Sequence, residues 1–259
     1  MGLAELVKRE QEFAQFSREH SMKQAFLKFL SDTSLVFRPE PMIARPIYEK
    51  VPDGSSVVLE WAPEYADCAV AGDLGYTFGP WQYRQSAVSD PSAYGNYFTV
   101  WERIPAGWFI YLDLGISYNE KNDLKTKCSY PSQYNIVSRA IDMKVINDLE
   151  MVLEKSTADK GYDMAVSDAA ESEVHIFRDG SRPMTLSVFQ PSDPRPDAIR
   201  FVVDKAKLAQ SGDMYVTYGT IVNSKNNKAR ASFVHVWKLT NDVWKITVDV
   251  VLTYAAEKE

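Results

Sequence analysis

AGDLGYTFG, residues 71–79, matches SGDMYVTYG, residues 211–219, and this match decides the fold. The two segments are 140 residues apart and share Gly72/Gly212, Asp73/Asp213, Thr77/Thr217 and Gly79/Gly219. A Gly-Asp pair is typical of a turn, and the β-branched and aromatic residues that follow it predict a strand. The chain therefore carries the same turn and strand twice.

The match extends outward in both directions. LVFR, which ends at Arg38, lies over HIFR, which ends at Arg178, again 140 residues away. FTVWERIPAGWFIYLDLG at 98–115 lies over VHVWKLTNDVWKITVDVV at 234–251 at a spacing of 136, because the loop QSAVSDPSAYG is longer in the first copy. Separate matches whose spacing changes only by the length of one loop indicate a tandem duplication of whole domains rather than a short solenoid repeat.

The duplication sets the predicted domain boundaries. With 259 residues the chain is longer than the commonest domain size. SYNEKNDLKTKCSYPSQYN is polar and lacks apolar periodicity, which is typical of a connecting segment. We predict a first domain at residues 1–117, a linker at 118–138 and a second domain at 139–259.

Each copy is predicted to begin with helices and to end with strands. In the first copy a long helix covers residues 3–19, and a shorter helix follows Ser21, which forms a capping-box signature with Gln24. The long helix of the second copy carries Ile141, Val145, Leu149 and Val152. Alternating apolar residues from Trp244 onward predict a half-buried final strand. Helices followed by runs of strands indicate an α+β fold.

Several motifs of the first copy, in this order, resemble one family. They are FLxFLxDxxLVFRPxP, a short helix near Arg45-Pro46-Ile47-Tyr48, WxPxYA, GDLGYTxGPW, YGxxxxVW and WxxxLDLGIS. Over about residues 10–117 this order is similar to the nuclear-transport-factor-2-like (NTF2-like) superfamily, and more narrowly to its SnoaL-like branch. The second copy has lost GPW and the YG pair and is identified mainly through its match to the first.

The resemblance implies a cystatin-like cone, in which a strongly bent antiparallel sheet wraps around the N-terminal helices and an apolar pocket lies in the mouth. Family members often dimerise through the outer face of the sheet. We therefore expect the two cones to pack as a pseudo-dimer through these faces, because fusion makes such an interface intramolecular. A monomer is expected, with higher oligomers left open.

The resemblance also implies where chemistry would occur. Ketosteroid isomerases, polyketide cyclases and scytalone dehydratase transfer protons inside the cone with an Asp or His base. Uninterrupted alternation along the last strand places Trp108, Ile110, Leu112 and Leu114 inward, so no base is expected there. Asp113 and its counterpart Asp249 are expected on the opposite face.

Aromatic side chains are the main candidates for ligand contact, although core and sheet packing could also account for them. The predicted ligand-binding residues are Trp61, Tyr65, Tyr76, Phe78, Trp81, Tyr83, Asn96 and Phe98. The leading hypothesis is that the first copy binds a small apolar or aromatic molecule without catalysis. One alternative is a cofactor-free isomerase, cyclase or dehydratase that uses His20 with Tyr76 or Tyr83. A second alternative is a structural or protein-interaction module.

Other classes of protein are disfavoured. A net charge of −6 argues against nucleic-acid binding. The sequence has no apolar run that could span a membrane and no leader-like block, so we expect a soluble protein that is cytoplasmic, or secreted or periplasmic if a leader was removed. Cys68 and Cys128 form no CxxC pair, and the metal-binding and phosphate-binding motifs are missing. No metal or cofactor is therefore expected.

Overall fold

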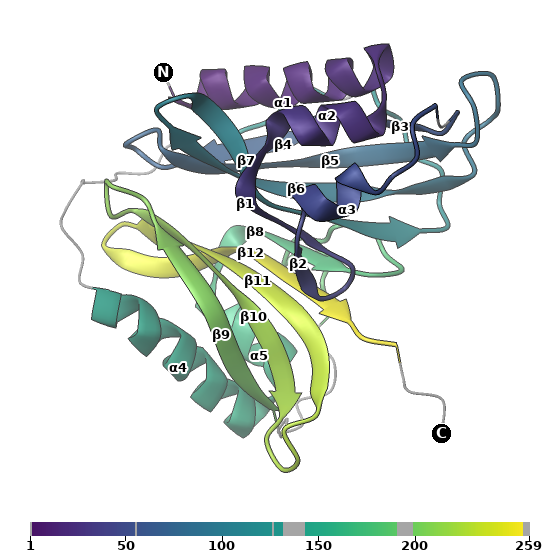
Figure 1. The fold of residues 1–259 in the computed structure, drawn as a ribbon. Coiled ribbons are helices and arrows are strands. Elements are labelled where there is room, and N and C mark those ends of the chain that lie inside the picture. Colours follow the sequence, from purple (N-terminus) through teal and green to yellow (C-terminus); the bar gives the residue numbers. More distant parts are fainter. Residues whose placement is uncertain (1, 55, 126, 132–142, 191–198, 256–259) are drawn as a thin grey trace. The chain divides into compact units, whose positions relative to one another are not determined.

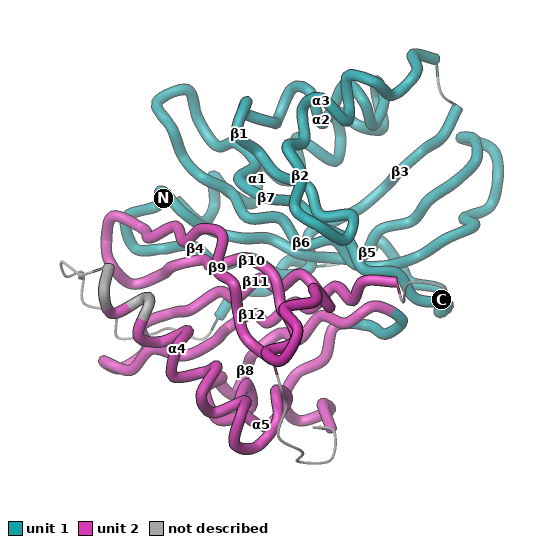
Figure 2. The backbone as a smooth tube through the Cα atoms, turned by 60° about the horizontal axis from the view of Figure 1, so that its bottom comes forward, with its two compact units in different colours: residues 1–132, 180–182 teal, residues 133–179, 183–259 magenta. Residues whose placement is uncertain are grey.

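The chain consists of two compact units. The computed structural model describes residues 2–54, 56–125, 127–131, 143–190 and 199–255. Unit 1 comprises residues 1–132 and 180–182, and unit 2 comprises residues 133–179 and 183–259 (Figure 2). The described residues of the segment 118–131, where the linker was expected to begin, belong to unit 1. The remainder of the expected linker lies outside the described residues.

Unit 1 is a seven-stranded sheet with helices on one face (Figure 1). Its helices are α1 (Gly2–Glu19), α2 (Met22–Phe29) and α3 (Arg45–Glu49). Its strands are β1 (Leu30–Phe37), β2 (Pro41–Ile43), β3 (Val58–Trp61), β4 (Tyr65–Cys68), β5 (Leu74–Arg84), β6 (Ala93–Ile104) and β7 (Gly107–Tyr118). They run in the order β2-β1-β7-β6-β5-β3, with β4 also paired to β5. The predicted cap of α2 is confirmed, since the Ser21 hydroxyl accepts from the Gln24 amide at 3.1 Å.

Unit 2 repeats this order with fewer strands. It contains α4 (Met143–Lys160), α5 (Tyr162–Ala169), β8 (Ala170–Arg178), β9 (Ile199–Leu208), β10 (Met214–Asn223), β11 (Ala229–Thr240) and β12 (Val243–Thr253), with the sheet order β8-β12-β11-β10-β9. On α4, Glu150 and Leu153 are buried, whereas Val145 and Val152, which the sequence placed on its apolar face, are exposed. Ile141 lies outside the described residues.

The α+β class is confirmed in both units, with one correction to the sheets. They are mixed rather than purely antiparallel, because β1 pairs with β7 in parallel and β8 pairs with β12 in parallel. In unit 1 the chain leaves α2 at Leu30, beside Ile110 near the start of β7, so both strands run in the same direction. The packing of the two units as a pseudo-dimer stays a prediction.

Both units carry a β-bulge at the same place. In unit 1 Val100 pairs with Leu112, but the next residue, Trp101, pairs with Ile110, so the strand register skips Tyr111. In unit 2 the same shift skips Thr247. A bulge exchanges the faces on which the following side chains lie.

The bulge corrects the predicted orientation of two aspartates. Asp113 lies on the helix-covered face together with Ile110, and Asp249 lies on the helix-covered face of unit 2, where it meets Tyr162 of α5. The expectation that both carboxyl groups point away from that face was wrong, because it assumed unbroken alternation along the strand.

The last glycine of the repeated motif has the same role in both units. A Cβ on Gly79 would lie 2.0 Å from the carbonyl oxygen of Ala62, and a Cβ on Gly219 would lie 2.0 Å from that of Val202. The neighbouring strand is interrupted or shifted beside each glycine, so its backbone crosses closely over the Cα. Only glycine fits at these two positions.

We expect Gly79→Ala and Gly219→Ala each to lower the free energy of unfolding by about 1–3 kcal/mol, because a backbone oxygen cannot move aside as a flexible side chain can. Gly115→Ala is the matched control, since its Cβ would have its nearest neighbour, Nε1 of Trp81, at an ordinary 3.4 Å. Urea denaturation of the three variants measures the difference. Equal losses in all three would contradict this explanation of the repeated glycine.

Candidate functional site

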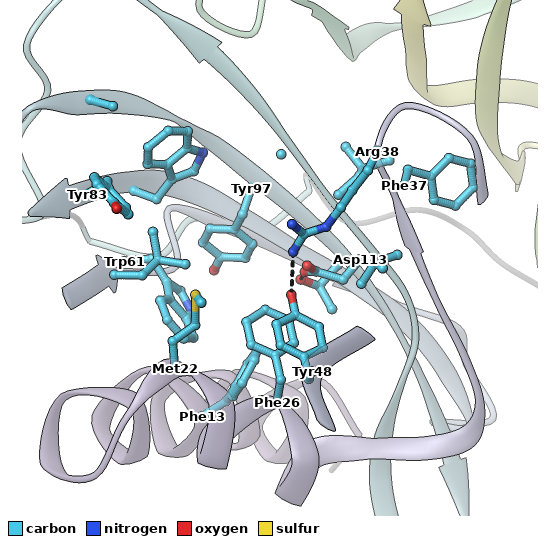
Figure 3. Close-up of a pocket in the computed structure, with 17 residues that line it drawn as sticks. Phe13, Met22, Phe26, Phe37, Arg38, Tyr48, Trp61, Tyr83, Tyr97 and Asp113 are labelled. Carbon is cyan, nitrogen blue, oxygen red and sulfur yellow. Dashed lines mark hydrogen bonds between the residues drawn. The ribbon is translucent and has the colours of Figure 1, made fainter. Parts of the chain in front are cut away.

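A cavity of about 470 Å³ lies in unit 1 between the helices and the sheet (Figure 3). Its volume is within the range of roughly 300–1,000 Å³ typical of small-molecule sites. Phe13 of α1, Met22 and Phe26 of α2, and Trp61 and Trp81 of β3 and β5 form much of its wall. The cavity is therefore largely apolar and rich in aromatic side chains.

The aromatic wall is held by ring packing. Phe13 meets Trp61 edge to face with ring centroids 4.7 Å apart, and it meets Phe26 in the same way at 5.0 Å. Phe26 in turn stacks on Tyr48 at 4.0 Å with nearly parallel planes. Rings that fix one another in this manner keep the cavity shape without a ligand.

One end of the cavity is polar. The carboxyl group of Asp113 on β7 accepts a hydrogen bond of 2.6 Å from the hydroxyl of Thr99 on β6. Arg38, which follows β1, donates to the hydroxyl of Tyr48 on α3 at 3.2 Å. Figure 3 shows the guanidinium of Arg38, the hydroxyl of Tyr48 and the carboxyl group of Asp113 gathered beside one another.

The environment shifts the acidity of Asp113. Its pKa is raised to about 7, because burial and the nearby carboxyl group of Glu10 raise it more than the Thr99 hydrogen bond and the Arg38 charge lower it. Near neutral pH both forms of the carboxyl group are therefore populated. A group with this property can act as a proton donor or acceptor.

Tyr97 supplies a polar atom inside the cavity. Its side chain is 7% exposed, and its hydroxyl has no hydrogen-bond partner in the described part of the chain. Figure 3 shows this hydroxyl directed into the space between Trp61 and Asp113. Burial raises its pKa well above the usual value, so the hydroxyl is neutral and can both donate and accept.

The predicted ligand-binding residues divide into two groups. Trp61, Trp81 and Tyr83 line the cavity. The others do not line it, and four of them stack together elsewhere in unit 1, with Tyr65 meeting Phe78 at 5.2 Å. These residues are Tyr65, Tyr76, Phe78 and Phe98. Asn96 accepts a 2.6 Å hydrogen bond from the hydroxyl of Tyr118. Ligand contact by any of the eight remains a prediction.

His20 lies outside the cavity. It is exposed, its ring packs on Phe16 with centroids 4.0 Å apart, and it borders a separate depression that contains Lys23 and Asp53. Tyr76 is fully buried and does not line the cavity either. The arrangement that the alternative enzyme hypothesis required, His20 converging with a tyrosine on one cavity, is not present.

The polar residues of the cavity were missed in the sequence as site residues. Two of them nevertheless carried a signal, because Arg38 and Asp113 are repeated in the second copy as Arg178 and Asp249. This repetition indicates a duplication and does not by itself locate a site.

A buried glutamate has matching hydrogen-bond partners in the two units. Glu10 accepts hydrogen bonds from Thr77 at 2.5 Å and from Trp101 at 3.1 Å. Glu150 accepts from Thr217 at 2.5 Å and from Trp237 at 2.8 Å. All three residues of each set occupy matching places in the sequence repeat. The same carboxylate clamp therefore anchors the long helix to the sheet in both units.

Unit 2 contains a buried charge network around its own aspartate. His235 contacts Glu150 through Nδ1 at 3.0 Å and the hydroxyl of Tyr162 through Nε2 at 3.0 Å. Tyr162 donates to Oδ1 of Asp249 at 2.6 Å, and Arg178 donates to Oδ2 of Asp249 at 2.5 Å. His235 and Asp249 are both 0% exposed.

The network alters the acidity of its members. Burial lowers the pKa of His235, but Glu150 and Asp249 raise it more strongly, to about 9. Burial raises the pKa of Asp249, but Arg178 and His235 hold it well below its usual range. At neutral pH the centre of unit 2 thus holds an imidazolium between two carboxylates.

The described ranges give no evidence of a membrane-spanning helix or of a metal-ion site. No helix there is sufficiently long and apolar to cross a membrane. In the same residues no group of three or more His, Cys, Asp or Glu side chains is arranged to hold a metal ion.

Comparison with known proteins gives structural matches alone. No protein-family model and no curated protein matches the sequence. A domain of unknown function with a cystatin-like fold from Nostoc punctiforme is 14% identical, with 42% of this chain and 73% of that chain covered and a TM-score of 0.35. An NTF2-like protein of unknown function from Shewanella oneidensis is 12% identical (43% and 96% covered, TM-score 0.36). Another from Methylobacillus flagellatus is 14% identical (46% and 99% covered, TM-score 0.35). These structures bear the names of the fold family that the sequence resembles.

Proposed function

We propose that unit 1 binds a small, largely apolar and aromatic molecule that carries one polar group directed toward Asp113. The observation that supports this most directly is the cavity of about 470 Å³, with aromatic side chains along its walls and Asp113, Arg38 and Tyr48 at one end. An apolar site with a few convergent polar groups is the usual form of a small-molecule pocket.

The unpaired hydroxyl of Tyr97 supports the same proposal. A buried polar group without a partner costs roughly 1–3 kcal/mol relative to a hydrogen-bonded one. A ligand with a polar atom near Tyr97 and Asp113 would remove this cost and gain affinity from it. The aromatic walls would supply the remaining affinity by burying the apolar part of the molecule.

Trp81→Ala is expected to weaken the binding of naphthalene, a simple aromatic probe, by about 10-fold, because a large aromatic contact is lost from the wall. Isothermal titration calorimetry measures the affinity. His20→Ala is the control and should leave it unchanged, since His20 does not line the cavity. Failure of aromatic probes to bind the unaltered protein, or equal affinity for both variants, would contradict the proposal.

A second candidate function is cofactor-free proton transfer on the bound molecule. The specific observation in its favour is Asp113, whose pKa is raised to about 7 at the polar end of an apolar cavity. The expectation of a non-catalytic protein rested on an empty base position, and Asp113 lies on the face that was expected to lack one. Deuterium exchange into an enolisable aromatic ketone tests this function, and the corresponding variants are argued in the Discussion.

A further inference from the structure

A side chain of unit 2 indicates which class of ligand would fit the cavity of unit 1. Met22 is the first residue of α2, and Tyr162 is the first residue of α5, a helix of the same length 140 positions later. Arg38 and Arg178 keep the same spacing. Tyr162 therefore occupies in unit 2 the position that Met22 occupies at the cavity of unit 1.

Tyr162 inserts a phenol into the polar centre of unit 2. Its ring is 9% exposed and meets Phe201 edge to face at 5.8 Å, and the guanidinium carbon of Arg178 lies 5.6 Å from the ring centroid. Its hydroxyl donates to Asp249 at 2.6 Å. The polar centre of unit 2 is thus filled by one of the protein's own side chains, an aromatic ring whose hydroxyl donates to the carboxylate of Asp249.

Unit 1 has the corresponding acidic group without the phenol. Asp113 and Arg38 match Asp249 and Arg178, but Met22 has no hydroxyl with which to reach the carboxyl group. The hydroxyl of Tyr48, the nearby tyrosine of α3, accepts a hydrogen bond from Arg38 and makes none with Asp113. Thr99 donates to Oδ1 of Asp113, and no described residue donates to its second carboxyl oxygen. One acceptor at the end of the cavity is therefore available.

We infer that the ligand of unit 1 is a phenol or a similar hydroxyl-bearing aromatic molecule, whose hydroxyl donates to Asp113 as that of Tyr162 donates to Asp249. The inference rests on the proposed binding function and makes its ligand class specific. An ionised carboxylate accepts hydrogen bonds and cannot donate them. Above about pH 7 the site therefore prefers a hydroxyl over an ether oxygen of the same size.

Three probes with the same ring system test this inference: 2-naphthol, 2-methoxynaphthalene and naphthalene. At about pH 8 we expect 2-naphthol to bind the unaltered protein about 10-fold or more tightly than the other two, because a hydrogen bond to a charged group is stronger than a neutral one. Asp113→Ala should reduce this preference to about 2-fold or less. Calorimetry gives all the affinities.

Met22→Tyr provides an independent test, because it places a phenol side chain of the protein itself at the position where unit 2 has Tyr162. It should abolish binding of 2-naphthol, whereas Met22→Leu should retain it. If Met22→Tyr does not fold, the probe series on the unaltered protein still decides. Equal binding of the three probes would overturn the inference and leave the proposed function standing, whereas no binding of any probe would overturn both.

Discussion

His235→Ala is expected to lower the free energy of unfolding of unit 2 by about 3–5 kcal/mol, because it removes one partner from a fully buried charge network. Glu150 would lose the imidazolium that lies 3.0 Å away and would keep hydrogen bonds from Thr217 and Trp237. Two neutral donors do not replace a positive charge for a carboxylate that water cannot reach.

Hydrogen exchange read by mass spectrometry can locate this loss, because it reports the amides of β10, β11 and β12 separately from those of unit 1. Thr99→Ala is the matched control, since Thr99 occupies the place of His235 in the sequence repeat and donates one hydrogen bond to Asp113. It should cost about 1 kcal/mol and act on unit 1. A similar small loss for His235→Ala would contradict the ionic description of unit 2.

The same network predicts how the stability of unit 2 depends on pH. The folded-state pKa of His235 is about 9, above the usual value of 6.5, so its contribution is complete below about pH 6.5 and is lost as the pH rises through 9. Asp249 has a depressed pKa, so its contribution is complete above about pH 4 and is lost in stronger acid. In His235→Ala the decline between about pH 6.5 and 9 should disappear.

The fold could be predicted because local signals and the duplication agree. The Ser21 cap, the turn at Gly72 and the period of two in the last strands each specify a local conformation, and the repeat requires that the conformation occur twice. The repeated Gly79 is explained by the close backbone approach of Ala62, a contact that no local pattern of the sequence reports. Its repetition shows only that some constraint acts there.

The candidate site could not be predicted, because it depends on the bulge at Tyr111. Neither Tyr111 nor its counterpart Thr247 is a glycine or another residue that marks a bulge in the sequence, so unbroken alternation was the natural assumption. This assumption places Asp113 outside the cavity and removes the most informative residue from the candidates. The burial of Glu150 on α4 was missed for a similar reason, because an apolar pattern does not reveal a buried carboxylate with its own donors.

The two units use the same constellation in different ways. In unit 2 Asp249 is ion-paired with Arg178 and accepts a hydrogen bond from Tyr162. These contacts keep its carboxyl group ionised and inaccessible to a ligand. In unit 1 Asp113 shares its region with Arg38 at longer range and borders a cavity, so burial dominates its pKa. Of these two matching aspartates, Asp113 and not Asp249 can exchange a proton near neutral pH.

If unit 1 catalyses proton transfer, Asp113→Asn should reduce deuterium exchange into 2-tetralone, an aromatic ketone with acidic C–H bonds, by about 10²–10⁴-fold, because the amide cannot accept the proton. Nuclear magnetic resonance in D₂O follows the exchange. His20→Ala should leave the rate unchanged, and the opposite result for these two variants would contradict the assignment of the base to Asp113.

The pH dependence provides the stricter test of that base. The ionised carboxylate is the active form, so the exchange rate of the unaltered protein should rise through about pH 7 and then level off. Arg38 lowers the pKa of Asp113, so Arg38→Gln should move this midpoint to higher pH while the plateau persists. An unshifted midpoint in Arg38→Gln, or a rate that is independent of pH across this range, would mean that a group other than Asp113 carries the proton.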